Sequence, residues 1–144
     1  MYILDTNVAS ELRKASGTRT GRAKLDANVR DWFGSVSAAS LYLSVITVLE
    51  LEIGCLQLER RDPAQGQVLR AWLQNYALPT FADRILPIDT AVALRCAALH
   101  APNRRSERDA LIAATALVHG MTVVTRNAGD FESTGVALLN PWQA

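Results

Sequence analysis

The stretch Met1-Tyr2-Ile3-Leu4-Asp5-Thr6-Asn7 decides the fold, because an apolar run ends abruptly in a carboxylate, a hydroxyl and an amide. Short apolar runs bounded by polar groups are typical of strands buried on both faces of a parallel sheet. The helical pattern that begins at Val8 puts Asp5 where a strand ends and a helix begins. Ligands of open α/β sheets bind at that edge. Asp5 is therefore a candidate helix cap and also a candidate ligand of a hard cation.

The rest of the chain alternates between strand-like and helical segments. Apolar runs predict further strands at 41–46, 84–88, 121–125 and 136–139. Helical spacing predicts helices that include 24–37, a pair between 47 and 76, 90–100 and 106–120. This alternation predicts an α/β fold with three layers: a central, mostly parallel sheet of four to five strands with helices on both faces. We expect a single domain that covers residues 1–144.

A second acidic residue follows the second predicted strand. Thr47 and Glu50 have the spacing of a capping box, which is a sufficient structural explanation for Glu50. The helix is nevertheless apolar on most sides, so we expect Glu50 to face the same polar pocket as Asp5. Gly54 lies one turn further on the same face and costs about 1 kcal/mol relative to alanine. We therefore expect another backbone to approach Gly54 closely.

A third acidic residue opens the last long helix, which Ser106 is expected to cap and Gly120 to end. Asp109 shares a face with the apolar residues Ile112, Ala113 and Ala116. The helix dipole favours an aspartate in the first turn. An unpaired carboxylate at the end of a buried stripe would still be costly, and a cation would remove that cost.

Polar residues also follow the fourth predicted strand, at Thr125, Asn127 and Asp130. If the strands are parallel, these residues meet Asp5 and the region of Glu50 at one edge of the sheet. Clustered carboxylates repel one another, and a divalent cation relieves that repulsion. A set of ligands made only of oxygen atoms favours Mg²⁺ or Mn²⁺ over zinc.

Such a cluster suits hydrolysis of a phosphodiester. A bound metal ion lowers the pKa of a water ligand and neutralises charge in the transition state. The alternative, from another functional class, is a non-catalytic interaction module whose acidic groove binds a basic partner peptide.

Composition adds few constraints on function. The net charge is +1 and 49% of the residues are hydrophobic, as in ordinary globular proteins. No segment approaches the roughly 20 apolar residues that span a bilayer, and none resembles a signal peptide. Cys55 and Cys96 lack metal-ligand or redox spacing, and we expect buried reduced thiols in a cytoplasmic protein. Basic residues other than Lys14 and Lys24 are arginines, which suits phosphate binding and equally reflects genome composition.

At this point the chain resembles a known family. The ordered motifs of PIN-domain ribonucleases, especially toxins of the VapC type, are similar to Ile3–Asn7, Thr47–Gly54, Asp109–Ala116 and Thr125–Phe131. The FitB-like branch, sometimes described as plasmid stability proteins, is similar at Arg84–Pro87 and at the closing Asn140-Pro141-Trp142.

The resemblance implies a Mg²⁺-dependent endoribonuclease that is the toxin of a type II toxin–antitoxin system. It implies that Asp5, Glu50 and Asp109 form the acidic triad that holds the metal. Asn127 stands where some members carry aspartate, so Asp130 is the candidate for the fourth acidic role, directly or through water. The supporting residues are expected to be Thr6, Asn7, Thr125 and Asn127.

The resemblance also implies partners. These are an RNA substrate, a second copy of the chain, and a small DNA-binding antitoxin that buries its C-terminal segment in the acidic groove. Operator DNA would be bound only through the antitoxin, and no membrane is involved. Arg108 departs from the small residues usual before the third acid. RNA phosphates or an acidic group of the antitoxin are candidate contacts of Arg104, Arg105, Arg108 and Arg126. For Arg104, Arg105 and Arg108 a solvated basic loop is an alternative that the sequence does not exclude.

Overall fold

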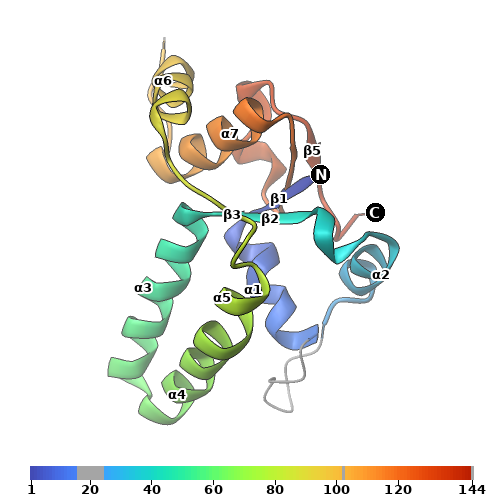
Figure 1. Cartoon of the computed structure of the whole chain (residues 1–144), viewed down its shortest axis with the longest axis vertical. Coiled ribbons are helices and arrows are strands. Elements are labelled where there is room, and N and C mark those ends of the chain that lie inside the picture. The colour runs from blue at the N-terminus through green and yellow to red at the C-terminus, as the bar shows by residue number, and fades with distance from the viewer. Residues whose placement is uncertain (16–24, 102, 144) are drawn as a thin grey trace.

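A parallel sheet lies at the centre of the molecule (Figure 1). The computed structural model describes residues 1–15, 25–101 and 103–143, and within these ranges the sheet has five strands in the order β3-β2-β1-β4-β5. Their bounds are β1 Tyr2–Leu4, β2 Leu41–Ser44, β3 Ile85–Leu86, β4 Thr122–Val124 and β5 Leu138–Leu139. All neighbouring pairs are parallel, so the carboxyl ends of the strands share one edge.

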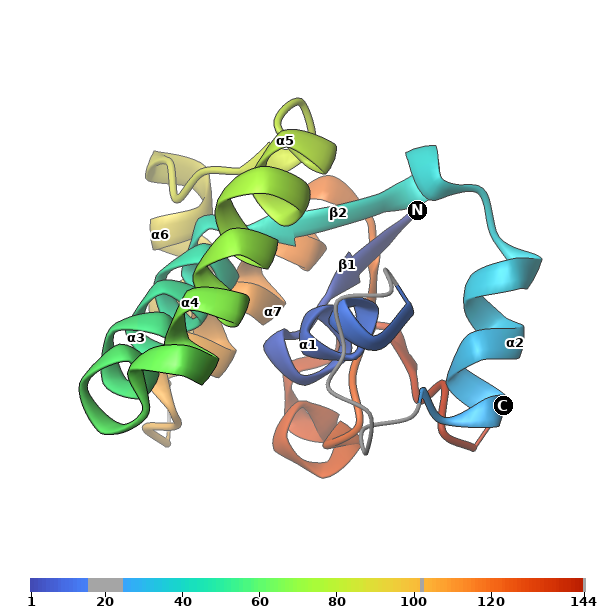
Figure 2. The same ribbon diagram turned by 90° about the horizontal axis from the view of Figure 1, so that it is seen from below.

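Helices cover both faces of the sheet, as Figures 1 and 2 show. One side carries α1, α3 and α4, and the other carries α6 and α7. The α-helices are α1 Thr6–Ala15, α2 Ala27–Ser35, α3 Val45–Arg61, α4 Pro63–Trp72, α5 Leu78–Thr80, α6 Thr90–Leu99 and α7 Glu107–His119. A π-helical turn, Leu73–Ala77, joins α4 to α5, and the short 3-10 segments are Ala38–Ser40, Ala128–Asp130 and Glu132–Thr134. The predicted three-layer α/β/α arrangement is confirmed.

The alternation of side chains along β1 divides the core between the two faces. Leu4 packs on one side in a cluster with Val8 and Trp72, and Ile3 packs on the other with Ile112 and Val123. Each of these side chains is at most 2% exposed. Successive residues of a strand point to opposite faces, so β1 is held by apolar burial from both sides. This burial fixes the position of the residue that follows, Asp5.

Helix α3 begins earlier in the chain than the sequence predicts. Strand β2 ends at Ser44, and Val45 and Ile46 already belong to the helix. The Ser44 hydroxyl caps α3 by accepting a hydrogen bond from the Ile46 amide at 3.0 Å. The capping box predicted for Thr47 and Glu50 is therefore wrong. Thr47 lies inside the first turn, fully buried, with its Oγ1 3.5 Å from the Leu4 carbonyl oxygen.

Other local signals gave the observed structure. Asp89 caps α6 by accepting from the Val92 amide at 2.9 Å, and Gly120 ends α7 in the left-handed region at φ 66°. β3 is an edge strand, as Pro87 predicts. The second helix is shorter than the predicted 24–37 because Asp26 caps it. The small, polar residues 15–22 predict a loop after the first helix, and its residues 16–22 lie outside the described residues.

The two cysteines are free and buried, in agreement with the prediction. Burial raises the pKa of both the Cys55 and the Cys96 thiol, which keeps them in the unreactive protonated form. In the described part of the chain, the helices are too short or too polar to cross a bilayer.

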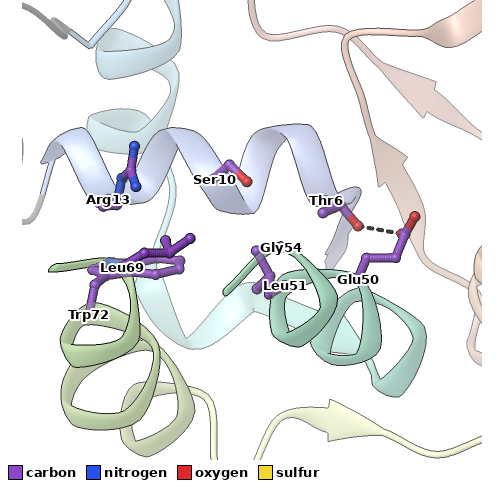
Figure 3. A pocket seen from close by; sticks show the side chains of 8 residues that line it. All are labelled: Thr6, Ser10, Arg13, Glu50, Leu51, Gly54, Leu69 and Trp72. Atoms are coloured by element: carbon purple, nitrogen blue, oxygen red, sulfur yellow. Dashed lines mark hydrogen bonds between the residues drawn. The ribbon is translucent and has the colours of Figure 1, made fainter. Parts of the chain in front are cut away.

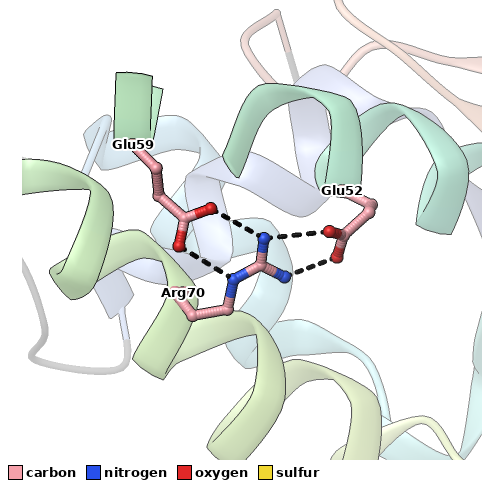
Figure 4. A network of polar contacts seen from close by, with 3 residues as sticks. All are labelled: Glu52, Glu59 and Arg70. Atoms are coloured by element: carbon pink, nitrogen blue, oxygen red, sulfur yellow. Dashed lines mark hydrogen bonds and ion pairs between the residues drawn. The ribbon is translucent and has the colours of Figure 1, made fainter. Parts of the chain in front are cut away.

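An arginine clamp joins α3 to α4 (Figure 4). The Arg70 guanidinium donates to Glu52 at 2.5 and 2.9 Å and to Glu59 at 3.0 and 3.3 Å. Paired parallel hydrogen bonds of this kind fix both distance and orientation. Hydrogen bonding from Arg70 lowers the pKa of the Glu52 carboxyl, so the clamp stays charged at neutral pH.

The close approach expected at Gly54 is found at a different glycine. A Cβ built on Gly54 meets nothing within 4 Å, so the prediction of a neighbouring backbone there is wrong. A Cβ on Gly66 of α4 would lie 2.6 Å from the Glu59 Cα. Helices α3 and α4 therefore touch at Gly66, next to the arginine clamp.

These two glycines predict opposite effects of the same substitution. Gly54→Ala should stabilise the fold by about 0.5–1 kcal/mol, because alanine is the better helix former and has room. Gly66→Ala should destabilise it by about 1–3 kcal/mol, because the added methyl group forces the helices apart. Urea denaturation, with the midpoints compared at equal slope, measures both. Equal changes at the two positions would contradict this account of the helix contact.

Candidate active site

Asp5 lies at the carboxyl end of β1, buried to 7% exposure, and its two oxygens are held by three neighbouring residues. Its Oδ1 accepts the Thr6 amide at 2.8 Å. Its Oδ2 accepts the Thr125 hydroxyl at 2.8 Å and the Asn7 side-chain amide at 3.3 Å. The bond from Thr125 joins the ends of β1 and β4 across 120 residues of sequence. The carboxylate therefore has a fixed orientation at the edge where the sheet meets α1.

The environment of Asp5 disfavours its charge. Burial raises the pKa of the Asp5 carboxyl above its ordinary value, and the nearby charges of Glu50 and Asp130 raise it further. The hydrogen bonds from Thr125 and the Thr6 amide oppose this shift. A buried carboxylate with like charges around it gains stability from any cation that binds there.

Glu50 reaches the site from the second turn of α3. Its Oε1 accepts the Thr6 hydroxyl at 2.6 Å, and its Oε2 lies 3.6 Å from Nη1 of Arg108. Thr6 thus contacts Asp5 through its amide and Glu50 through its hydroxyl. The expectation that Glu50 faces the same pocket as Asp5 is met by this bridge through Thr6.

Asp109 and Asp130 complete the acidic group. Burial raises the pKa of the Asp109 carboxyl, followed by the charges of Asp5, Asp130 and Glu50, and a hydrogen bond from Ser106 opposes the shift. Ser106 stands at the N-cap of α7 but its side chain makes no capping bond there. Asp130 lies on the exposed 3-10 segment Ala128–Asp130. Four acids far apart in sequence are therefore within electrostatic range of one another.

The ligand atoms that this acidic group offers are of the chemical type that a hard divalent cation prefers. All four are carboxylates, whose oxygen atoms suit such a cation, and burial together with nearby like charges raises the pKa of Asp5 and Asp109. As the side chains stand, however, no three of the His, Cys, Asp and Glu residues in the described ranges form a group that holds a metal ion. Glu50 is instead bound to Thr6 and Arg108. Metal binding would therefore require a change of side-chain conformation, with Glu50 the obvious candidate.

The supporting residues predicted from the sequence lie around Asp5. Besides contacting Asp5, the Asn7 side chain accepts the Arg126 amide at 3.2 Å. Thr125 Oγ1 also accepts the Asn127 amide at 3.0 Å. Asn127 contributes to this network through its backbone.

The four arginines predicted as contacts differ in their surroundings. Arg108 pairs with Glu50, and Arg126 stacks over Trp142 at 4.9 Å from the ring centroid. Arg105 donates to the Leu99 carbonyl oxygen at 2.8 Å and to Ser133 at 2.7 Å. Arg105 thus has a structural role in this loop. Arg104 is exposed.

A cavity of about 170 Å³ lies beside Glu50, between α1, α3 and α4 (Figure 3). Leu51, Gly54, Leu69 and Trp72 give it apolar walls, with Thr6 and Glu50 at one end. Ser10 and Arg13 of α1 also line it. In the described part of the chain, the buried Trp72 Nε1 has no hydrogen-bond acceptor. This cavity is not predicted from the sequence, and Gly54, one turn after Glu50, is the residue that could have indicated it.

The sequence matches the family model of the PIN domain over residues 2–136. The chain belongs to the PIN-domain family. This PIN domain is 39% identical to the plasmid stability protein StbB of Pseudomonas syringae pv. tomato, with 100% of both chains covered. It is 38% identical to VapC ribonuclease Y4jK of Sinorhizobium fredii and 39% identical to toxin FitB of Neisseria gonorrhoeae, with 99% of each chain covered.

A solved structure shows the same likeness. The PIN domain matches FitAB bound to an IR36 DNA fragment with a TM-score of 0.84 and 37% identity, covering 99% of this chain and 96% of that one. The resemblance to VapC-type toxins and their FitB-like branch is confirmed by these relatives.

The environment of Asp5 predicts a specific pH dependence of stability. The pKa of Asp5 is higher in the folded protein than in the unfolded chain. Between these two pKa values the folded PIN domain binds more protons than the unfolded chain, so its stability falls as the pH rises through that range. In the absence of divalent cations, Asp5→Asn should raise Tm at pH 7, and this gain should vanish below the ordinary carboxyl pKa of about 4. Thermal melts of both proteins across pH, in chelator, test this. Asp31→Asn, at an exposed position of α2, is the matched control. A gain in Tm for Asp5→Asn that is the same at every pH would contradict this explanation of the buried charge.

Proposed function

We propose that this PIN domain is a Mg²⁺-dependent endoribonuclease and the toxin of a type II toxin–antitoxin system, with Mn²⁺ as an alternative metal. The observation that carries the proposal is the convergence of Asp5, Glu50, Asp109 and Asp130 at the carboxyl edge of a parallel sheet. The relatives named VapC ribonuclease and toxin FitB support the activity.

The chain's own residues supply binding and orientation. Asp5, Glu50 and Asp109 would hold the metal ion, and Asp130 contributes charge from the exposed rim. Thr6 and Thr125 fix the Asp5 carboxylate, and Asn7 supports it. When bound, Mg²⁺ supplies Lewis acidity at the scissile phosphate and an acidified water ligand. We propose that the exposed side chain of Arg126, which stacks on Trp142, contacts the RNA backbone.

Loss of the buried carboxylate should abolish cleavage. Purified Asp5→Asn should cut RNA at least about 100-fold more slowly than the wild type in Mg²⁺ or Mn²⁺. Gel-based cleavage of labelled RNA by antitoxin-free protein is the measurement. Asp31→Asn should cleave at the wild-type rate. Equal rates for Asp5→Asn and the wild type would remove Asp5 from the mechanism, and no cleavage by either would favour a non-catalytic module that binds a basic peptide.

The antitoxin is proposed to be a small DNA-binding protein, so that operator DNA is bound only through it. Support comes from the similarity to FitAB, which is bound to DNA in the solved structure. We propose that its C-terminal segment enters the acidic groove and that an apolar side chain fills the cavity between Leu51, Gly54 and Trp72. Exposed apolar side chains of α3, Leu49 and Leu56, support the further proposal of a homodimer.

The cavity gives a test of antitoxin binding that does not touch the acids. Gly54→Leu would fill the cavity and should weaken binding of the antitoxin encoded by the neighbouring reading frame by at least about 10-fold, the scale of about 1.4 kcal/mol. Gly54→Ala is the matched control, because it leaves most of the space open. Isothermal titration calorimetry measures both affinities. Unchanged binding by Gly54→Leu would place the antitoxin elsewhere.

A further inference from the structure

Four arginines are predicted to contact RNA or the antitoxin. In the described structure, Arg108 is the one of these four that pairs with an acid of the candidate site. Its Nη1 lies 3.6 Å from Glu50 Oε2. The Arg108 side chain is 50% exposed and the Glu50 side chain 27% exposed, so the pair sits at the mouth of the site. The guanidinium therefore already acts as a counter-cation for the Glu50 carboxylate.

The position of Arg108 on its helix is electrostatically unfavourable. It is the second residue of α7, which spans Glu107–His119, so its positive charge lies at the positive end of the helix dipole. A residue that breaks a local rule in this way is a candidate for a functional role. Glu50, which pairs with Arg108, compensates for this position.

The pair between Arg108 and Glu50 is weak enough to separate. Close charge-assisted hydrogen bonds span about 2.7–2.9 Å, and this contact is longer. Ion pairs with exposed partners contribute only about 0–1 kcal/mol. The Thr6 hydroxyl holds the other Glu50 oxygen at 2.6 Å, so release of Arg108 would leave Glu50 anchored on one side.

We propose that Arg108 is a positioning residue with two alternative partners. Without a divalent cation it neutralises Glu50. With Glu50 bound to a divalent cation instead, the Arg108 guanidinium would leave Glu50 and contact a phosphate of the bound RNA. The inference rests on the proposed nuclease function and adds to it a residue that couples metal binding to RNA binding.

Metal affinity is the first test. Calorimetric titration with Mn²⁺ should show about two- to fivefold tighter binding by Arg108→Ala than by the wild type, because the competing cation is gone. In a Glu50→Gln background the same substitution should have almost no effect, because Glu50→Gln has already removed the charge with which Arg108 pairs. The four proteins form a double-mutant cycle that isolates this pair. Arg95→Ala, at an exposed position of α6, controls for the loss of one positive charge. An equal gain in both backgrounds, or no gain, would overturn the proposal.

RNA affinity is the second test. Binding of a phosphorothioate RNA, which resists cleavage, is followed by fluorescence anisotropy in Mn²⁺ at several salt concentrations. Arg108→Ala should lower the slope of log affinity against log salt by about 0.7, the value for one phosphate contact with a single strand. Arg95→Ala should not change the slope, and an unchanged slope for Arg108→Ala would also overturn the proposal.

The two hypotheses fail in different ways. If the wild type binds no Mn²⁺, or if Asp5→Asn binds it equally well, the proposed nuclease site is wrong. If the wild type binds Mn²⁺ through Asp5 but Arg108→Ala changes neither the affinity for Mn²⁺ nor the affinity for RNA, only the proposed role of Arg108 is wrong.

Discussion

The central position of β1 between two parallel neighbours is the constraint on which the rest of the structure depends. Its register with β2 and β4, together with apolar burial of Ile3 and Leu4 on opposite faces, fixes where the strand ends. The residue that follows is therefore held in a buried position at the edge of the sheet. That residue is Asp5, and its burial creates an electrostatic cost that hydrogen bonds from Thr125 and the Thr6 amide only partly offset.

The other site residues can be understood as responses to this buried charge. Thr125 reaches Asp5 from the end of β4, and Thr6 connects Asp5 to Glu50 of α3. Asp109 adds to the repulsion from α7. Such an arrangement stores an unfavourable interaction in the metal-free fold, and a divalent cation can release it on binding. The arginine clamp between α3 and α4 keeps the wall of the neighbouring cavity in place without contacting these acids.

The sequence predicted those features that depend on local chemistry. An apolar run before Asp5 and a helix end at Gly120 each act within a few residues. The start of α3 was misplaced because Ser44 and Thr47 are both competent caps, and burial of Thr47 under Leu4 decides between them. The role of Gly54 and the pairing of Arg108 with Glu50 depend on how separate helices cross, which periodicity in one segment does not encode.

The central claim is that the separate acids share one divalent cation at the carboxyl edge of the sheet. Anomalous X-ray diffraction from crystals grown with Mn²⁺ tests it most directly. The account predicts an anomalous peak in contact with both Asp5 and Asp109, with Glu50 turned away from Arg108. A peak elsewhere, or none with the Glu50–Arg108 pair intact, would contradict it.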